Sequence, residues 1–214
     1  MIALVIGGSG SGKSAYAEQM AVKAAGNGSL YYVATMQVYD EEGKKKVERH
    51  QKMRAGKGFL TIEQPRRLEE AAKKVAAESV PAEIASAGKV TTEKAPTGVE
   101  KTVLLECMSN LVANEMFSEE NLSAVMDEAK IKQLSHEIIS GVTALQDSCD
   151  ILIIVTNQIF EDGIRYDAST MAYIRLLGDV NRQIAERAEQ VIEVVAGIPI
   201  FIKKDGIIRK KRNT

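Results

Sequence analysis

The sequence has no tryptophan, and aromatic residues make up only 5% of its 214 residues. Proteins that bind single-stranded nucleic acid stack bases on aromatic side chains, so this scarcity argues against such a surface. The formal net charge is −1, which gives the chain no basic excess to attract a polyanion. No apolar run approaches the roughly 20 residues that a membrane-spanning helix needs. We therefore expect no nucleic-acid partner and no membrane span.

Cysteine and proline are also scarce. The two cysteines, Cys107 and Cys149, lack the spacing of metal ligands, so we expect reduced thiols in apolar surroundings. Pro81 and Pro96 fall among small and polar residues, and residues 79–99 are predicted to form a flexible insertion. The first residues, MIALVIGG, are too short and lack the basic flank of a signal peptide, which predicts a cytoplasmic protein.

Short apolar runs alternate with helical patterns along the chain. Strands are predicted at 3–6, 29–35, 59–63, 102–106 and 150–157, and helices at 13–25, 41–54, 65–78 and 169–187. Continuous apolar runs are typical of parallel strands buried on both faces, and helices between them complete βαβ units. VIEVVAG and IPIFIK, joined by a short link, predict an antiparallel edge hairpin. We expect one α/β domain over residues 1–214, with a mostly parallel sheet, helices on both faces and a basic C-terminal tail.

The segment GGSGSGKS fits the pattern G-x-x-x-x-G-K-[ST] between a predicted strand and a predicted helix. Glycines let the backbone curl so that its N–H groups point at phosphate oxygens, and the helix adds the positive end of its dipole. Lys13 would reach the β- and γ-phosphates, and the Ser14 hydroxyl would ligate Mg²⁺. The loop comprises Gly7, Gly8, Ser9, Gly10, Ser11, Gly12, Lys13 and Ser14. The motif predicts a P-loop NTPase fold of the RecA-like type that binds a nucleoside triphosphate.

Two further residues have local patterns that allow more than one interpretation. Such sites often place a second acidic residue at the end of a neighbouring strand to hold Mg²⁺, and Glu106, which closes VLLE, is the candidate. A carboxylate that stabilises the start of the following helix is the alternative. His50 lies in the charged run ERHQKM, and charge runs usually mark a solvated helix face.

The order and spacing of further short motifs distinguish this chain from a generic phosphate-loop protein. They are YVAT (32–35), K-V-x-x-H-x-x-x-R (46–54), LLEC (104–107), VTN (155–157) and GDVNRQIA (178–185). With GGSGSGKS they give a chain that resembles the adenosylcobinamide kinase/adenosylcobinamide-phosphate guanylyltransferase family of cobalamin synthesis. The resemblance covers nearly the whole chain, apart from residues 79–99 and about the last ten residues.

The resemblance implies two reactions at one nucleotide site. First, the γ-phosphate of ATP or GTP goes to the aminopropanol hydroxyl of adenosylcobinamide. Second, a histidine attacks the α-phosphorus of GTP, pyrophosphate leaves, and GMP passes to adenosylcobinamide phosphate to give adenosyl-GDP-cobinamide. His50 matches that nucleophile, and a neutral imidazole with an ordinary pKa of about 6.5 is suited to the role at pH 7. The family also implies a homo-oligomer, specifically a trimer.

Other residues take nucleotide-binding roles through the same resemblance. Thr35, Met36 and Gln37 follow the second predicted strand and match a stretch beside the nucleotide. Glu63 matches a guanosine contact, where a carboxylate would accept from guanine N–H groups and favour GTP over ATP; an exposed strand-end carboxylate is the alternative. The segment that carries the histidine adds Gln51, Lys52, Met53 and Arg54. His136, far from any motif, is predicted to be a partly buried structural residue.

The chain departs from the family pattern at three places. Gly10 stands where the family commonly has arginine, so one positive charge is missing from the phosphate loop. Residues 158–165 keep only the Gly-Ile core of a glycine-rich stretch, and AGKGF (55–59) replaces a Pro-Trp pair. None of these changes removes a group that the proposed chemistry requires.

Two other classes of protein remain open at this point. A phosphate-loop kinase for a small metabolite or a nucleoside monophosphate would use Lys13, Ser14 and Glu106 in the same way but leave His50 as a surface residue. A RecA-like ATPase would contact DNA through the basic tail KKDGIIRKKRNT. The near-neutral net charge and the few aromatic residues count against that third class.

Overall fold

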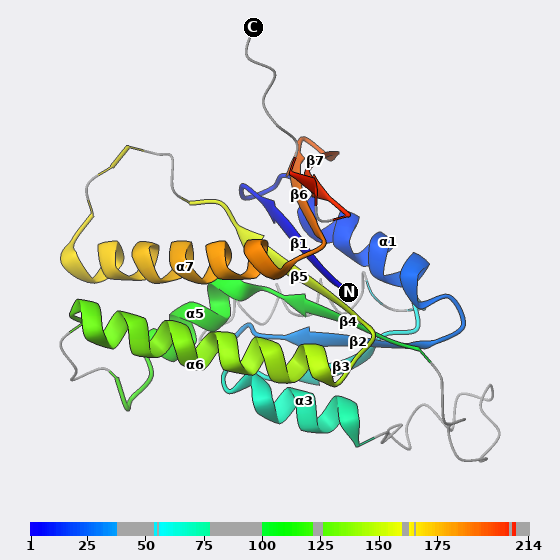
Figure 1. Cartoon of the computed structure of the whole chain (residues 1–214), viewed down its shortest axis with the longest axis horizontal. Helices are drawn as coiled ribbons and strands as arrows, with labels where there is room; N and C mark the ends of the chain where they lie inside the picture. Colours follow the sequence, from blue (N-terminus) through cyan, green and yellow to red (C-terminus); the bar gives the residue numbers. More distant parts are fainter. Residues whose placement is uncertain are drawn as a thin grey trace, which may run out of the picture.

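A single twisted sheet forms the centre of the molecule (Figure 1). The computed structural model describes residues 1–37, 54, 56–77, 100–121, 126–159, 163–164, 166–205 and 207–208. The strands of this part of the chain are β1 (Ile2–Gly7), β2 (Ser29–Ala34), β3 (Leu60–Glu63), β4 (Lys101–Glu106), β5 (Ile151–Asn157), β6 (Gln190–Val195), β7 (Ile198–Lys204) and β8 (Ile207–Ile208). They lie in the order β3-β2-β4-β5-β1-β6-β7-β8. Neighbours from β3 to β6 are parallel, and β7 and β8 are added antiparallel.

Helices cover both faces of this sheet, as the sequence predicts (Figure 1). They are α1 (Lys13–Ala25), α3 (Leu68–Ala76), α5 (Met108–Met116), α6 (Glu128–Asp147) and α7 (Ala168–Arg187). Side chains alternate across a strand, so Ile2 and Leu4 of β1 join the apolar cluster under α3, α5, α6 and α7. Ala3 and Val5 face the other way and pack with Ala17 of α1. The mostly parallel α/β architecture and its edge hairpin are therefore confirmed.

The C-terminal edge differs from the prediction in one detail. The hairpin of β6 and β7 is present, but a short further strand, β8, follows within the segment that was predicted to be only a basic tail. Lys203 and Lys204 pair with Ile208 and Ile207, which supplies backbone hydrogen bonds to one edge of β7. Within the described residues, no helix combines the length and the apolar character that crossing a membrane requires.

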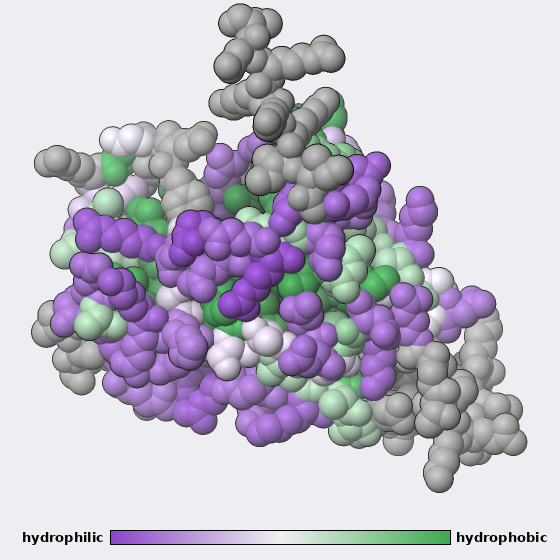
Figure 2. All heavy atoms as spheres, viewed as in Figure 1, coloured by the Kyte–Doolittle hydropathy of each residue, from purple (hydrophilic) through white to green (hydrophobic). Residues whose placement is uncertain are grey.

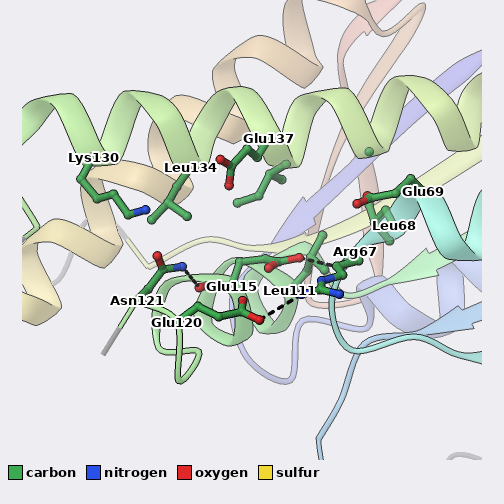
Figure 3. Close-up of a pocket in the computed structure, with 12 residues that line it drawn as sticks. Arg67, Leu68, Glu69, Leu111, Glu115, Glu120, Asn121, Lys130, Leu134 and Glu137 are labelled. Carbon is green, nitrogen blue, oxygen red and sulfur yellow. Dashed lines mark hydrogen bonds and ion pairs between the residues drawn. The ribbon is translucent and has the colours of Figure 1, made fainter. Parts of the chain in front are cut away.

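The prediction that a helix begins at Pro65 is wrong, because α3 begins at Leu68. Arg67 has a φ of 55°, which is outside the helical region. Its backbone N–H donates to Glu115 Oε1 at 2.6 Å, and its guanidinium Nη2 donates to Glu120 Oε1 at 2.9 Å (Figure 3). These long-range contacts hold the residues before α3 out of a helical conformation, which the local sequence does not reveal.

The prediction of a partly buried His136 is also wrong. Leu134 and Ile138 of α6 are 2% and 4% exposed, whereas His136 is exposed. Two residues along a helix correspond to a rotation of about 200°, so a residue midway between two buried positions points away from the sheet. Figure 2 shows that this side of the molecule carries mainly hydrophilic residues over the helices.

A candidate nucleotide site at the carboxyl edge of the sheet

The phosphate loop connects β1 to α1 and is held by the hairpin beside it. Ser11 N donates to Gly8 O at 3.2 Å, and Gly197 N, in the turn between β6 and β7, donates to Ser11 O at 2.8 Å. Gly12 precedes the first residue of α1 with a φ of 88°, a conformation that favours glycine. The loop is therefore shaped by the protein's own contacts, and its backbone forms a concave N-terminal end of α1.

Lys13 lies in this loop as a largely buried cation with 8% exposure. Its Nζ donates to Gly8 O at 3.1 Å. Burial lowers the pKa of Lys13, while the nearby Glu106 and Cys107 act in the opposite direction. An ammonium has three N–H donors, so one bond to a carbonyl leaves capacity for phosphate oxygens. Ser14 follows in the first turn of α1.

Parallel pairing brings Glu106 and Asn157, the last residue of the VTN motif, to the same edge. Ala34 is opposite Glu106 in the pairing of β2 with β4, and Gly7 is opposite Asn157 in the pairing of β1 with β5. Asn157 Nδ2 donates to Ser109 Oγ at 2.7 Å, at the start of α5. The carboxyl ends of parallel strands are where open α/β sheets bind ligands.

Thr35 has a structural role in this arrangement. Its Oγ1 donates to Cys107 O and accepts from Cys107 N, both at 2.8 Å, and Asn114 Nδ2 donates to Thr35 O at 2.8 Å. The side chain is fully buried. Thr35 therefore connects the end of β2 to the start of α5. It can influence a bound nucleotide only by fixing the positions of the residues next to it. Met36 and Gln37 are half-buried beside it.

The end of β2 also carries a group that the sequence did not single out as functional. Tyr32 is 3% exposed, and its hydroxyl donates to Glu106 Oε2 at 3.1 Å. Burial, assisted by the Glu106 charge, raises the pKa of Tyr32, so the phenol remains a donor. The Phe59 ring meets the Tyr32 ring edge-on, with centroids 5.8 Å apart. Tyr32 thus orients the Glu106 carboxylate, and its place as the first residue of the YVAT motif is the one sequence signal that indicated it.

Arg54 lies over the same tyrosine. Its Cζ is 3.6 Å from the centroid of the Tyr32 ring, and the residue is 7% exposed. Arg54 Nε and Nη1 are buried, and neither has a hydrogen-bond partner in the part of the chain that the structure describes. The aromatic face stabilises the cation in part, but buried N–H groups without acceptors cost free energy. An anionic ligand at this position would satisfy them.

A buried carboxylate completes the polar groups on this face. Glu18 of α1 is 1% exposed, and Lys57 Nζ forms an ion pair with its Oε2 at 2.5 Å. The other oxygen, Oε1, has no partner within the described segments. Glu18 also contributes to the charge environment of Tyr32. Sequence reasoning missed both Glu18 and Lys57, because neither lies in a recognisable motif.

The sheet order places Glu106 and Glu63 at different distances from the phosphate loop. Adjacent strands are about 4.8 Å apart, so β4 is roughly 10 Å from β1 and β3 is roughly 19 Å from it. Glu63 is exposed at the end of β3. Glu106 can therefore act near the phosphates, whereas Glu63 can reach only the far end of a nucleotide that extends along the edge.

The remaining predicted residues cannot be placed. His50, Gln51, Lys52 and Met53, like the 79–99 insertion, lie outside the described residues. Arg54 is the described member of that motif, and it lies at the nucleotide edge of the sheet.

The fold and this edge define a phosphate-loop protein of the α/β class that binds nucleotides. A family model described as "Cobinamide kinase / cobinamide phosphate guanyltransferase" matches residues 3–93 and 82–202, and the chain belongs to this family. Similar proteins align with nearly the whole of this chain. The "Bifunctional adenosylcobalamin biosynthesis protein CobU" of Escherichia coli is 29% identical over 95% of this chain and 100% of that protein.

Two further comparisons agree with this assignment. The protein of the same name from Salmonella typhimurium is 27% identical over 95% of this chain and 100% of that protein. The "Bifunctional adenosylcobalamin biosynthesis protein CobP" of Pseudomonas aeruginosa is 25% identical over 94% of this chain and 96% of that protein. The relatives thus align along essentially their full lengths.

Arg54→Met tests the interpretation of the guanidinium whose Nε and Nη1 have no acceptor among the described residues. Stability should be unchanged or higher, because a buried cation with unsatisfied donors is replaced by an apolar chain of similar length. The Kd for GTP should rise about 10- to 100-fold, which corresponds to the loss of one or two charge-assisted hydrogen bonds. Thermal melting and isothermal titration with GTP measure the two effects, with the exposed Arg182→Met as the control. A Kd within twofold of the original protein would remove Arg54 from the nucleotide site.

Proposed function

We propose that this chain carries out both reactions that its family name describes. It phosphorylates adenosylcobinamide with ATP or GTP, and it then transfers GMP from GTP through a guanylyl-histidine to adenosylcobinamide phosphate, giving adenosyl-GDP-cobinamide in cobalamin biosynthesis. The observation that carries the proposal is the pairing of a complete phosphate loop with Arg54, whose buried Nε and Nη1 have no acceptor among the described residues. The family match supplies the substrate class.

In the phosphoryl transfer, the loop backbone and Lys13 would hold the terminal phosphates. Ser14 and Glu106 would hold Mg²⁺, since a hydroxyl and a carboxylate are the hard oxygen ligands that this ion prefers alongside phosphate and water. The bond from Tyr32 to Glu106 fixes the carboxylate for this role. Mg²⁺, when bound, would neutralise charge on the phosphates.

In the guanylyl transfer, His50 would attack the α-phosphorus of GTP, and pyrophosphate would leave. Four residues of chain reach about 14 Å at most, so a nucleophile four positions before Arg54 is tethered to the nucleotide edge. Arg54 would stabilise the charge that develops on the α-phosphate, and Gln51, Lys52 and Met53 would contact the same nucleotide. Glu63 would accept from the guanine base, consistent with its place farther along the edge.

The remaining features of the proposal concern the assembly and location of the protein. We infer one domain over residues 1–214, because relatives of this family align over 95% of the chain. A homotrimer is supported by exposed apolar residues on β7, Ile198, Ile200 and Ile202, which a subunit contact would cover. A cytoplasmic location is supported by the two free cysteines. The acceptor substrates are small molecules and include no nucleic acid.

Labelling with GTP tests the proposal directly. The protein should acquire a guanylyl group from α-labelled GTP, and the adduct should survive alkali and hydrolyse in acid, as a phosphoramidate does. His50→Ala should give no adduct, while exposed His136→Ala, the matched control, should label fully. Adduct formation that persists in His50→Ala would reject His50 as the nucleophile. Phosphoryl transfer without any adduct in the original protein would indicate a kinase that lacks the guanylyl step.

A further inference from the structure

A cavity of about 690 Å³ adjoins the phosphate loop and is lined by residues near β5, β6 and α7. Its described lining residues come from the loop, the residues just after β5, the start of α7 with the residues before it, and β6: Gly8, Gln158, Ile159, Tyr166, Thr170, Tyr173, Ile174 and Glu193. Gly8 is the residue whose carbonyl accepts from Lys13 Nζ at 3.1 Å. The cavity therefore opens beside the ammonium group that would hold the terminal phosphates.

Backbone contacts fix the position of Glu193 in this cavity. Glu193 of β6 is paired in register with Ile6 of β1, one residue before the phosphate loop begins. The next carbonyl, that of Val194, lies so close to Gly7 that a Cβ there would be 2.7 Å away. Glu193 is half-buried, and within the described residues no hydrogen bond or ion pair engages its carboxylate.

The chemistry of the residues that line the cavity indicates the kind of ligand that it can bind. Among the described residues that line this cavity, Glu193 is the one carboxylate and none is a lysine or an arginine, so these residues offer no cation to a phosphate group. A carboxylate without a partner is instead a strong acceptor for a hydroxyl or amide donor. Ile159, Tyr173 and Ile174 supply apolar wall surface, which suits the aliphatic part of the same ligand.

We propose that this cavity binds the hydroxyl-bearing arm of the phosphate acceptor and that Glu193 is the base of the phosphoryl transfer. The inference rests on the proposed function, since it assigns a place to the acceptor of that reaction. The acceptor oxygen forms a bond to the γ-phosphorus while its proton passes to a carboxylate oxygen of Glu193. The bond from the γ-phosphorus to the bridging oxygen breaks, the nucleoside diphosphate leaves, and Glu193 later releases the proton to water.

Glu193→Gln tests this assignment with a side chain of the same shape. The kcat for phosphoryl transfer to adenosylcobinamide should fall about 100-fold or more, as is usual when a general base is removed. The Kd for ATP or GTP should stay within twofold, because the cavity holds the acceptor and not the nucleotide. Glu186→Gln, an exposed carboxylate near the end of α7, is the control and should retain full activity.

Two further variants separate a chemical role from a structural one. In Glu193→Ala, added formate should restore part of the lost rate, since the cavity has room for a small carboxylate. Ile174→Trp should raise the KM for the acceptor at least 10-fold by filling the cavity, with GTP labelling of His50 unchanged. Retained phosphoryl transfer in Glu193→Gln, or an equal loss of nucleotide affinity, would overturn the inference. Absence of phosphoryl transfer in the original protein would instead reject the proposed function.

Discussion

Lys13→Ala should lower both phosphoryl transfer and guanylylation by at least about 100- to 1000-fold, the usual cost of removing one donor that stabilises developing charge. Lys13 Nζ contacts Gly8 O inside the phosphate loop, so this is the cation placed to reach the terminal phosphates. Stability should not fall, because a buried ammonium is removed and burial already lowers its pKa. Initial rates of both reactions and thermal melting measure these effects.

Lys23→Ala is the matched control, since Lys23 lies on the exposed side of the same helix. Lys13→Arg should be nearly as inactive as Lys13→Ala, because a planar guanidinium cannot replace a compact ammonium in a loop shaped for one. If Lys13→Ala kept more than a tenth of either rate, the loop would bind nucleotide without taking part in that reaction.

The conformation of the described residues can be predicted from the local sequence in segments where one sequence pattern dominates. The runs at 3–6, 102–106 and 150–157 are so continuously apolar that only strands buried on both faces accommodate them, and the structure has β1, β4 and β5 there. The glycine-lysine pattern at residues 7–14 likewise requires a strand before it and a helix after it. In these segments local preference and tertiary packing favour the same conformation.

Prediction failed where contacts between distant residues decide the conformation. The start of α3 depends on the bond from Arg67 to Glu115, and 48 positions separate the two residues. The contact between Tyr32 and Glu106 spans 74 positions and exists because β2 and β4 are neighbours in the sheet. Glu193 was not singled out, because only the pairing of β6 with β1 brings it to the phosphate loop.

The resulting site has groups on both sides of the loop. Arg54 and Tyr32 lie at β2, whereas Glu193 lies on β6, and β1 is between these two strands in the sheet order. In the proposed roles, Glu193 and Arg54 would therefore act on one bound nucleotide from different sides of the loop. This separation gives a physical reason why one phosphate loop can serve attack at the γ-phosphorus and attack at the α-phosphorus.

Gly7→Ala should weaken nucleotide binding and also destabilise the fold. A Cβ at this position would lie 2.5 Å from Ser11 Oγ and 2.7 Å from Val194 O. The serine can rotate, but the carbonyl belongs to β6, so β1 and β6 would have to separate where they support the loop. Overpacking of this kind costs about 1–3 kcal/mol, and the displaced backbone N–H groups should raise the Kd for GTP at least 10-fold.

Gly8→Ala is the control for stability, because a Cβ there meets no atom within 4 Å. Urea unfolding measures the free energy of unfolding of both variants, and titration with GTP measures their Kd. Equal stability of Gly7→Ala and Gly8→Ala would show that the contact with β6 does not support the loop.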